Sequence, residues 1–261
     1  MNPILAVDMA AVIILTTAGN ARELGIDEEQ WVYLRGGADC NDIWYVSERP
    51  VLHASPAVRS IFAAVSAHTG IALDEIGRFD IYSCFPSAVQ VSCRELGLDP
   101  RDPRGVTVTG GLPYFGGPGN NYSLHAIAEM AHVLRAEGGH GLVTANGMYL
   151  TKHSIGLYSR EAPQQAWQPI DSAPLQAAID AAATVAPAKD PSGPAMVETF
   201  TVAFGREGPK QGIVIARNEA GERIVANTRD DEQVLKDLLD NDPIGQTGRV
   251  TVENGINRIA L

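Results

Sequence analysis

The stretch Thr109–His125, TGGLPYFGGPGNNYSLH, joins a strand-like segment to a helix-like one through five glycines. Glycine permits positive φ and lets a backbone approach a ligand closely. The helix start near Asn120 also offers free N–H groups and a positive dipole end, which suit an oxyanion or a phosphate. The pattern matches neither G-x-G-x-x-G nor G-x-x-x-x-G-K-[ST], so the loop is either a structural turn or a ligand loop. The glycines that would line a ligand are Gly110, Gly111, Gly116 and Gly117.

Outward from this loop, strand-like and helix-like segments alternate. Ser55 and Pro56 are an N-cap and first-turn pair that predict a helix over residues 57–70. Residues 5–24 also have helical spacing before Gly25. Other helices are predicted over residues 87–98 and 122–139, and strands over residues 30–38, 79–85, 105–111, 141–150 and 152–159. This alternation predicts an α/β fold, a mixed sheet with helices in layers.

The pattern changes after Glu161. A Pro-rich connection and a short helix are followed by five short strands with one helix, residues 230–240, between them. Such a run over about 65 residues is typical of a small OB-like β-barrel. We therefore predict an α/β domain over residues 1–165, a linker with a short helix over 166–195, and a barrel over 196–261.

Composition narrows the functional classes. The net charge of −11 and the lack of a Lys/Arg cluster argue against nucleic-acid binding. Residues 197–261 hold only two aromatic residues and an acidic helix, which also disfavours a single-strand-binding barrel. The first 17 residues are apolar, but Asp8 interrupts them and no basic segment precedes them, so we expect buried core and no membrane partner.

The three cysteines fit neither a disulfide framework nor a Cys/His zinc site, so we expect no metal and a reducing, cytoplasmic setting. Tyr82 and Cys84 alternate at the end of a predicted strand, where open α/β sheets bind ligands. Next to the helix that starts at Pro86, Cys84 would have a lowered pKa and thiolate character. The alternative is a buried, unreactive cysteine, which is how we interpret Cys93.

Two further polar residues are candidates. His125 begins the helix after the glycine loop and either faces the loop or lines a packing surface with His132. Asn146 has two alternative interpretations. With Gly147 it forms a tight-turn pair between two predicted strands, or it is a site residue at the end of a strand. We find no Ser-His-Asp arrangement and no G-x-S-x-G motif, and we interpret His153 as an ordinary strand residue.

In this order the motifs resemble the C-terminal half of the thiolase superfamily. Residues 6–26 resemble the segment that opens that half, and DIYSCFPSAVQ (80–90) stands where thiolases have Asn-Glu-Ala-Phe or His-Asp-Cys-Phe. VTVTGGLPYFGGPG (106–119) stands at their glycine pair and Gly-His-Pro, and GLVTANGMYL (141–150) at their Cys-x-Gly turn. The chain is most similar to acetyl-CoA acetyltransferase-like, thiolase-like proteins with an added OB-like C-terminal domain, and the resemblance covers essentially its whole length.

The departures from the thiolase pattern concern the reacting groups. The nucleophilic cysteine of the family belongs to an N-terminal half that this sequence lacks. Gly117 replaces the histidine of Gly-His-Pro, Tyr82 replaces the Asn or His of the second motif, and Asn146 replaces the cysteine of the third. Only Cys84 matches, through His-Asp-Cys-Phe. The resemblance thus implies Tyr82, Cys84, His125 and Asn146 as catalytic candidates, with His125 or Tyr82 as substitute for the missing base.

The resemblance implies carbon–carbon bond chemistry on acyl-CoA in lipid metabolism, as an acyltransferase or a retro-aldolase. Coenzyme A thioester would be the substrate, without a covalently bound cofactor. The reaction would be incomplete without a thiolase N-terminal half, so a homo-oligomer or a complex with such a subunit is expected. The alternative is a non-catalytic acyl-CoA-binding or scaffolding module, which the missing nucleophile and Gly117 favour.

Overall fold

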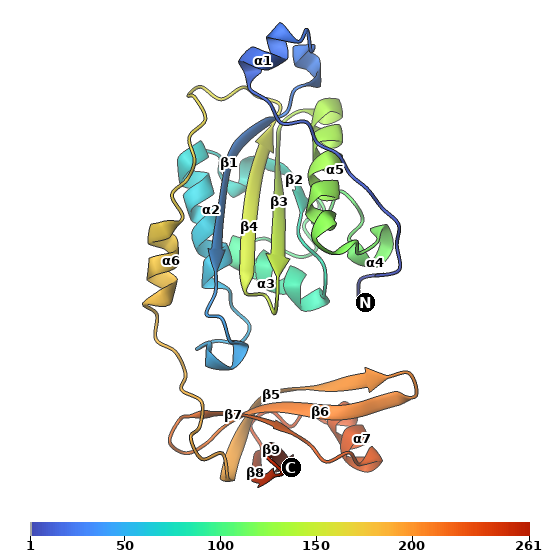
Figure 1. Cartoon of the computed structure of the whole chain (residues 1–261), viewed down its shortest axis with the longest axis vertical. Helices are drawn as coiled ribbons and strands as arrows, with labels where there is room; N and C mark the ends of the chain where they lie inside the picture. The colour runs from blue at the N-terminus through green and yellow to red at the C-terminus, as the bar shows by residue number, and fades with distance from the viewer. Residues whose placement is uncertain (1) are drawn as a thin grey trace. The chain divides into compact units, whose positions relative to one another are not determined.

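A computed structural model describes residues 2–261 and divides into two units, each with its own hydrophobic core (Figure 1). The first unit comprises Met1–Asp42 and His53–Ala182. The second comprises Ile43–Leu52 and Ala183–Leu261. The short segment Ile43–Leu52 therefore interrupts the first unit in sequence and belongs to the second.

The first unit is built on a four-stranded mixed sheet with the strand order β1-β4-β3-β2. Its strands are β1 (Tyr33–Asn41), β2 (Ile76–Asp80), β3 (His140–Gly147) and β4 (Lys152–Ser159). β4 runs antiparallel to both β1 and β3, whereas β2 and β3 are parallel. The carboxyl ends of β2 and β3 consequently lie at the same edge of the sheet.

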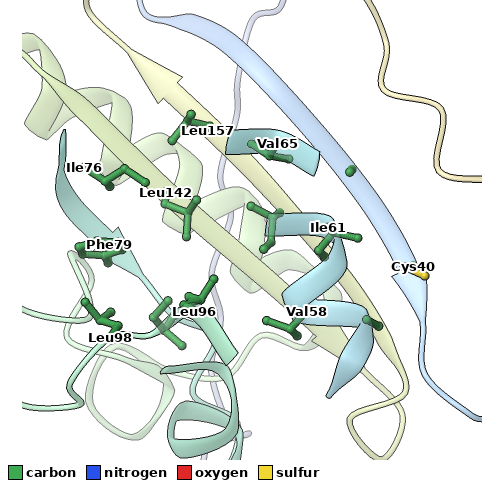
Figure 2. Packing of buried hydrophobic residues seen from close by; sticks show 14 of the residues in the cluster. Cys40, Val58, Ile61, Val65, Ile76, Phe79, Leu96, Leu98, Leu142 and Leu157 are labelled. Carbon is green, nitrogen blue, oxygen red and sulfur yellow. The ribbon is translucent and has the colours of Figure 1, made fainter. Parts of the chain in front are cut away.

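Helices cover both faces of this sheet, which confirms the predicted α/β class. The helices of the first unit are α1 (Ala18–Glu23), α2 (Pro56–Thr69), α3 (Pro86–Leu96), α4 (Leu112–Phe115), α5 (Tyr122–Glu137) and α6 (Ala173–Asp180). Figure 2 shows the core on one face, where Ile61 of α2 and Leu96 of α3 pack with Leu142 of β3. The next residue of β3, Val143, packs instead with Met130 of α5. The sheet is thus apolar on both sides because successive strand residues point to opposite faces.

Local sequence explains α2 well. The Ser55 hydroxyl accepts a hydrogen bond from the Val58 N–H, Pro56 is the first helical residue, and Gly70 ends the helix at φ 70°. Each feature is a standard helix boundary signal. The predicted helix over 57–70 is confirmed.

Two other predictions were wrong. Of residues 5–24 only Ala18–Glu23 is helical, and Val12, Ile14 and Leu15 are more than 80% exposed instead of buried. The run of β-branched residues disfavours a helix, and no element of residues 2–261 covers these side chains. Residues 105–111 form no strand, because the backbone at Val108 and Thr109 bonds the Asp80 side chain instead of a neighbouring strand.

The second unit contains a closed five-stranded barrel with the strand order β5-β6-β7-β9-β8, as predicted from the pattern of short strands. Its elements are β5 (Gly193–Gly205), β6 (Gly208–Arg217), β7 (Arg223–Asn227), α7 (Glu232–Asp240), β8 (Thr247–Glu253) and β9 (Ile256–Ala260). Small and branched residues fill the interior, among them Val197, Val214, Ala216 and Ile259. The outward residues alternate with them along each strand.

Arg223 holds the segment Ile43–Leu52 against this barrel. Its side chain is almost wholly buried and donates to the carbonyl oxygens of Ser47 and Arg49 at 2.9 and 2.7 Å. Its Nε lies 2.6 Å from Glu198 Oε2. The buried guanidinium is therefore satisfied by one carboxylate and two backbone acceptors. Among residues 2–261, no helix combines the length and apolar character needed to cross a membrane.

Candidate functional site

Tyr82, Cys84 and Asn146 meet where β2 and β3 end. Residues 81–85 follow β2 directly, and Asn146 is the last but one residue of β3. The Tyr82 N–H donates to Thr144 Oγ1 at 2.9 Å, and the Cys84 thiol donates to Asn146 Oδ1 at 3.4 Å. The carboxyl ends of the two parallel strands thereby bring together residues that are distant in sequence.

Asn146 does not form the tight turn that its sequence predicts. It pairs with His153 within the β3–β4 ladder, and the turn is made by the residues after Gly147, with positive φ at Met148 and Leu150. The Asn146 side chain is free to reach Cys84 for this reason. Its Nδ2 is the one buried side-chain polar atom between residues 2 and 261 that has no hydrogen-bond partner. Such an atom calls for an explanation, because leaving a buried donor unpaired is unfavourable.

The Cys84 thiol is half-buried, and burial raises its pKa above the ordinary value. A backbone hydrogen bond from Phe85 acts in the opposite direction and does not reverse the shift. Of the two alternatives for Cys84, the raised pKa contradicts the reactive thiolate and agrees with the buried, unreactive cysteine. At neutral pH Cys84 is a thiol that can donate a proton.

Tyr82 is likewise a neutral proton donor. Burial, and to a lesser extent Cys84, raises the pKa of its phenol. Its ring packs edge-on against Tyr122, with 5.2 Å between ring centroids. The Tyr82 and Cys84 side chains belong to one apolar cluster with α5, on the opposite face of the sheet from the core in Figure 2.

A buried carboxylate that the sequence analysis missed holds the first part of the glycine loop. Asp80 is wholly buried, and its Oδ2 accepts hydrogen bonds from the hydroxyl of Thr107 and the N–H groups of Val108 and Thr109. Its Oδ1 accepts from the Tyr122 hydroxyl at 2.9 Å. Burial raises the pKa of Asp80 even though these donors lower it. The sequence does contain a signal for this residue, because a charged side chain at the end of a buried strand is rare and requires partners.

The four glycines of the loop do not form one binding cradle. Gly111 has φ +83°, and a Cβ there would lie 2.8 Å from the Ser83 hydroxyl, which accepts from the Leu112 N–H. Next to it is a pocket of about 200 Å³. It is lined by Ile81, Ser83, Phe85, Pro86, Val89, Val106, Thr107, Gly110, Gly111, Pro113 and Tyr114.

Gly116 and Gly117 lie against the N-terminal segment instead of the pocket. The Gly117 N–H donates to the Ile4 carbonyl at 2.8 Å, and a Cβ at Gly117 would lie 2.7 Å from Pro3 Cβ. A Cβ at Gly116 would lie 2.8 Å from Met9 Sδ. This part of the loop has no room for the histidine that thiolases carry at the position of Gly117.

His125 is separate from the other candidates. Its ring packs on Phe115, with 5.4 Å between centroids, and its Nε2 lies 3.3 Å from Asn121 Nδ2. Within the described part of the chain, no hydrogen bond joins it to Tyr82, Cys84 or Asn146. The role of His125 as substitute base stays a prediction.

A second cluster joins Asp42, Ser55 and His153, although the sequence analysis saw no such arrangement. Ser55 Oγ lies 2.5 Å from Asp42 Oδ2, and His153 Nε2 lies 3.1 Å from the same oxygen and 3.3 Å from the hydroxyl. A serine triad uses the two different ring nitrogens, whereas here one nitrogen meets both partners. Ser55 also caps α2, so this cluster ties α2 to the ends of β1 and β4 and does not activate a nucleophile.

The main site therefore offers one unpartnered amide donor, one thiol and one phenol beside an apolar cluster. None of them is negatively charged at neutral pH. The arrangement suits the stabilisation of a negative charge that develops on an oxygen during a reaction. The described residues contain no group of three or more His, Cys, Asp or Glu placed to hold a metal ion.

Comparisons with known proteins agree with this architecture. Residues 174–254 match the family model of the thiolase-like protein type 1 additional C-terminal domain. The chain is also similar to a solved structure of a monomeric SCP2-thiolase-like protein type 1 from Mycobacterium smegmatis, with 43% identity and a TM-score of 0.85. That match covers 93% of this chain and 53% of the other, so the chain spans about half the length of that relative. No curated protein matches the sequence.

Proposed function

Because the chain is thiolase-like and carries the additional C-terminal domain of thiolase-like proteins, we propose that it takes part in carbon–carbon bond chemistry on acyl-CoA thioesters. The reaction is either acyl transfer of the acetyl-CoA acetyltransferase kind or retro-aldol cleavage. Both pass through a species in which negative charge collects on the thioester carbonyl oxygen, so both need hydrogen-bond donors at that oxygen.

The unpartnered Nδ2 of Asn146 is the observation that carries this proposal. It is a buried donor without an acceptor in residues 2–261, at the strand ends where ligands bind in such sheets. A thioester carbonyl oxygen would satisfy it. Its Oδ1 already accepts from Cys84, which fixes the amide in one orientation. The donor is therefore held ready before substrate arrives, which favours the charged state over the neutral one.

Cys84 is the group proposed to move a proton at the α-carbon of the acyl group. In retro-aldol cleavage the β-hydroxyl proton passes to water as the carbon–carbon bond breaks, and the electron pair of that bond forms the enolate. The Cys84 thiol gives its proton to the α-carbon, and water restores the thiol. In the reverse direction the thiolate takes that proton back. Tyr82, a neutral phenol, donates a hydrogen bond to the oxygen on the other side of the breaking bond. A nucleophile that would hold an acyl group as a thioester is proposed to come from a thiolase N-terminal half.

Deuterium exchange at the α-carbon of acetyl-CoA in D₂O tests these roles without an added thiolase N-terminal half. NMR of the full chain should show catalysed exchange that accelerates as pH rises, because burial raises the pKa of Cys84. Cys84→Ala should abolish exchange, and Asn146→Ala should slow it about 100-fold. Asn120→Ala, an exposed residue of the glycine loop, should leave the rate unchanged. Exchange that survives Cys84→Ala would contradict the assignment.

A non-catalytic acyl-CoA-binding module is the second candidate, and the environment of Gly117 favours it. The N–H of Gly117 is already bonded to Ile4, and the neighbouring residues leave no space for a side chain there. This candidate and the first differ in one measurement. Acetyl-CoA that binds saturably without any exchange of its α-protons would support the binding module and contradict the catalytic proposal.

A further inference from the structure

Three arginines surround a pocket on the outer surface of the barrel, away from its apolar interior. The pocket has a volume of about 220 Å³ and is lined by Arg229, Arg249, Thr251, Arg258, Ile259 and Ala260. Arg258 donates a hydrogen bond to the Thr228 carbonyl oxygen at 2.8 Å.

Strand register explains why the arginines converge. Arg249 of β8 pairs with Ala260 of β9, and Thr251 pairs with Arg258. Paired residues of antiparallel strands share a face, so Arg249 and Arg258 are diagonal neighbours on the outside of the barrel. The neighbouring pair of Val250 and Ile259 points inward and is buried. Arg229 follows the end of β7, the strand on the other side of β9.

The positive charge of this pocket is not balanced. Glu253 lies 3.7 Å from Arg229, and Asp230 lies 4.0 Å from Arg258, so two carboxylates face three guanidinium groups. The Arg249 side chain makes no hydrogen bond or ion pair with any residue of the part described, 2–261. Like charges side by side on a sheet are unfavourable unless an anion joins them. The excess stands out in a chain of net charge −11.

We infer that this pocket is a binding site for a small phosphate ester or diphosphate. Guanidinium groups bind phosphate oxygens in bidentate fashion, and a tetrahedral anion can accept from several of them at once. The Thr251 hydroxyl adds a further donor at the same pocket. No aromatic residue lines the pocket, so it lacks the stacking surface of a single-strand-binding site. The site lies outside the unit that holds Cys84 and Asn146, and the inference does not rest on the function proposed for them.

Calorimetric titration of the full chain with inorganic pyrophosphate at low salt tests the inference. One saturable site is expected, and Arg249→Ala should weaken binding about tenfold or more, the effect of losing a charged hydrogen-bonding partner. Arg206→Ala removes the same charge from the exposed turn between β5 and β6 and should leave the affinity within about twofold, as expected for a charge outside the site. Because Arg249 is exposed, its substitution should not disturb the barrel.

Three results would overturn the inference. They are the absence of saturable binding to the unaltered chain, equal weakening by Arg249→Ala and Arg206→Ala, and tighter binding of a single-stranded oligonucleotide than of pyrophosphate through Arg249. Coenzyme A and dephospho-coenzyme A then serve as further probes, since either should compete with pyrophosphate for the site. No acyl group takes part in the titration, so its failure would leave the proposal for Asn146 and Cys84 unaffected.

Discussion

The Cys84 thiol donates a hydrogen bond to Oδ1 of Asn146 across 3.4 Å, although the two residues are 62 positions apart. This contact fixes the orientation of an amide whose other end, Nδ2, has no partner within residues 2–261. Of the thiolase patterns that the sequence resembles, His-Asp-Cys-Phe has a cysteine at the position of Cys84, and Cys-x-Gly has one at the position of Asn146. Here one thiol and one amide form a neutral donor pair, which changes the chemistry expected from a thiolase-like site.

Asp80 should matter for the shape of the glycine loop more than for the charge of the site. Asp80→Leu removes the acceptor of several buried donors and should lower the free energy of unfolding by about 3 kcal/mol or more. Asp80→Asn keeps one oxygen as acceptor for the N–H groups of Val108 and Thr109. Its NH₂ group can donate to the Tyr122 hydroxyl oxygen, so we expect the free energy of unfolding to fall by about 1 kcal/mol. Urea denaturation compares them, and equal losses would contradict this account.

Asp42 should make the first unit sensitive to acid. Burial alone would raise the pKa of Asp42, but hydrogen bonds from His153, Ser55 and the Ala57 N–H lower it below the ordinary 3.8. A carboxyl with a lowered folded-state pKa contributes stability above its unfolded pKa and loses it as pH falls through the folded value. The gap in unfolding free energy between the unaltered chain and Asp42→Asn should therefore shrink below about pH 4. Parallel curves from pH 7 to pH 3 would refute the assignment.

Arg223 and Arg217 offer a matched comparison in the barrel. Both contact Glu198, but the Arg223 side chain is 1% exposed and that of Arg217 is 29% exposed. Arg223→Ala leaves two backbone carbonyls without their buried donor and Glu198 with Arg217 as its remaining arginine, and it should cost about 3 kcal/mol. Arg217→Ala should cost about 1 kcal/mol or less, as a partly exposed ion pair does. Thermal unfolding of the two variants decides the order, and an equal effect would contradict it.

The exposed apolar segment near the N-terminus should drive association. Val12, Ile14 and Leu15 each expose more than 80% of their surface, and the exposure of neighbouring apolar side chains to water is energetically unfavourable. We expect the chain to self-associate or to bind an apolar dye, in line with the proposed need for a complementing half. The double variant Val12→Ser and Ile14→Ser should reduce both effects. Sedimentation velocity that finds a strict monomer, together with no dye binding, would count against this prediction.

The features that could be predicted from the sequence are those encoded by residues close to one another along the chain. The Ser55-Pro56 start and the Gly70 stop of α2 act over a few residues, so the helix could be predicted. The alternating short strands likewise predicted the closed barrel. Residues 5–17 have helical spacing but no surface to pack against. Because most of the stability of a helix in a protein comes from tertiary packing, the spacing alone does not make this segment helical.

The candidate site shows the same limit. Tyr82 and Cys84 could be placed at a strand end because the strand and the following helix are locally encoded. The partner of Cys84 could not be found by pattern, because Asn146 reaches it through the pairing of β2 with β3. The Asp42 cluster escaped notice for the same reason, since its members come from three elements with no common spacing.

The most direct test of the central claim measures the thioester carbonyl itself. Isotope-edited infrared spectroscopy of acetyl-CoA labelled with ¹³C at the carbonyl reports the strength of hydrogen bonding to that oxygen when the ligand binds the full chain. We predict a shift of the bound carbonyl band to lower frequency, lost in Asn146→Ala and kept in the control Asn120→Ala. A bound carbonyl band that shifts equally in Asn146→Ala, or a chain that binds no acetyl-CoA at all, would contradict the claim that Asn146 Nδ2 is the donor for an acyl-CoA thioester.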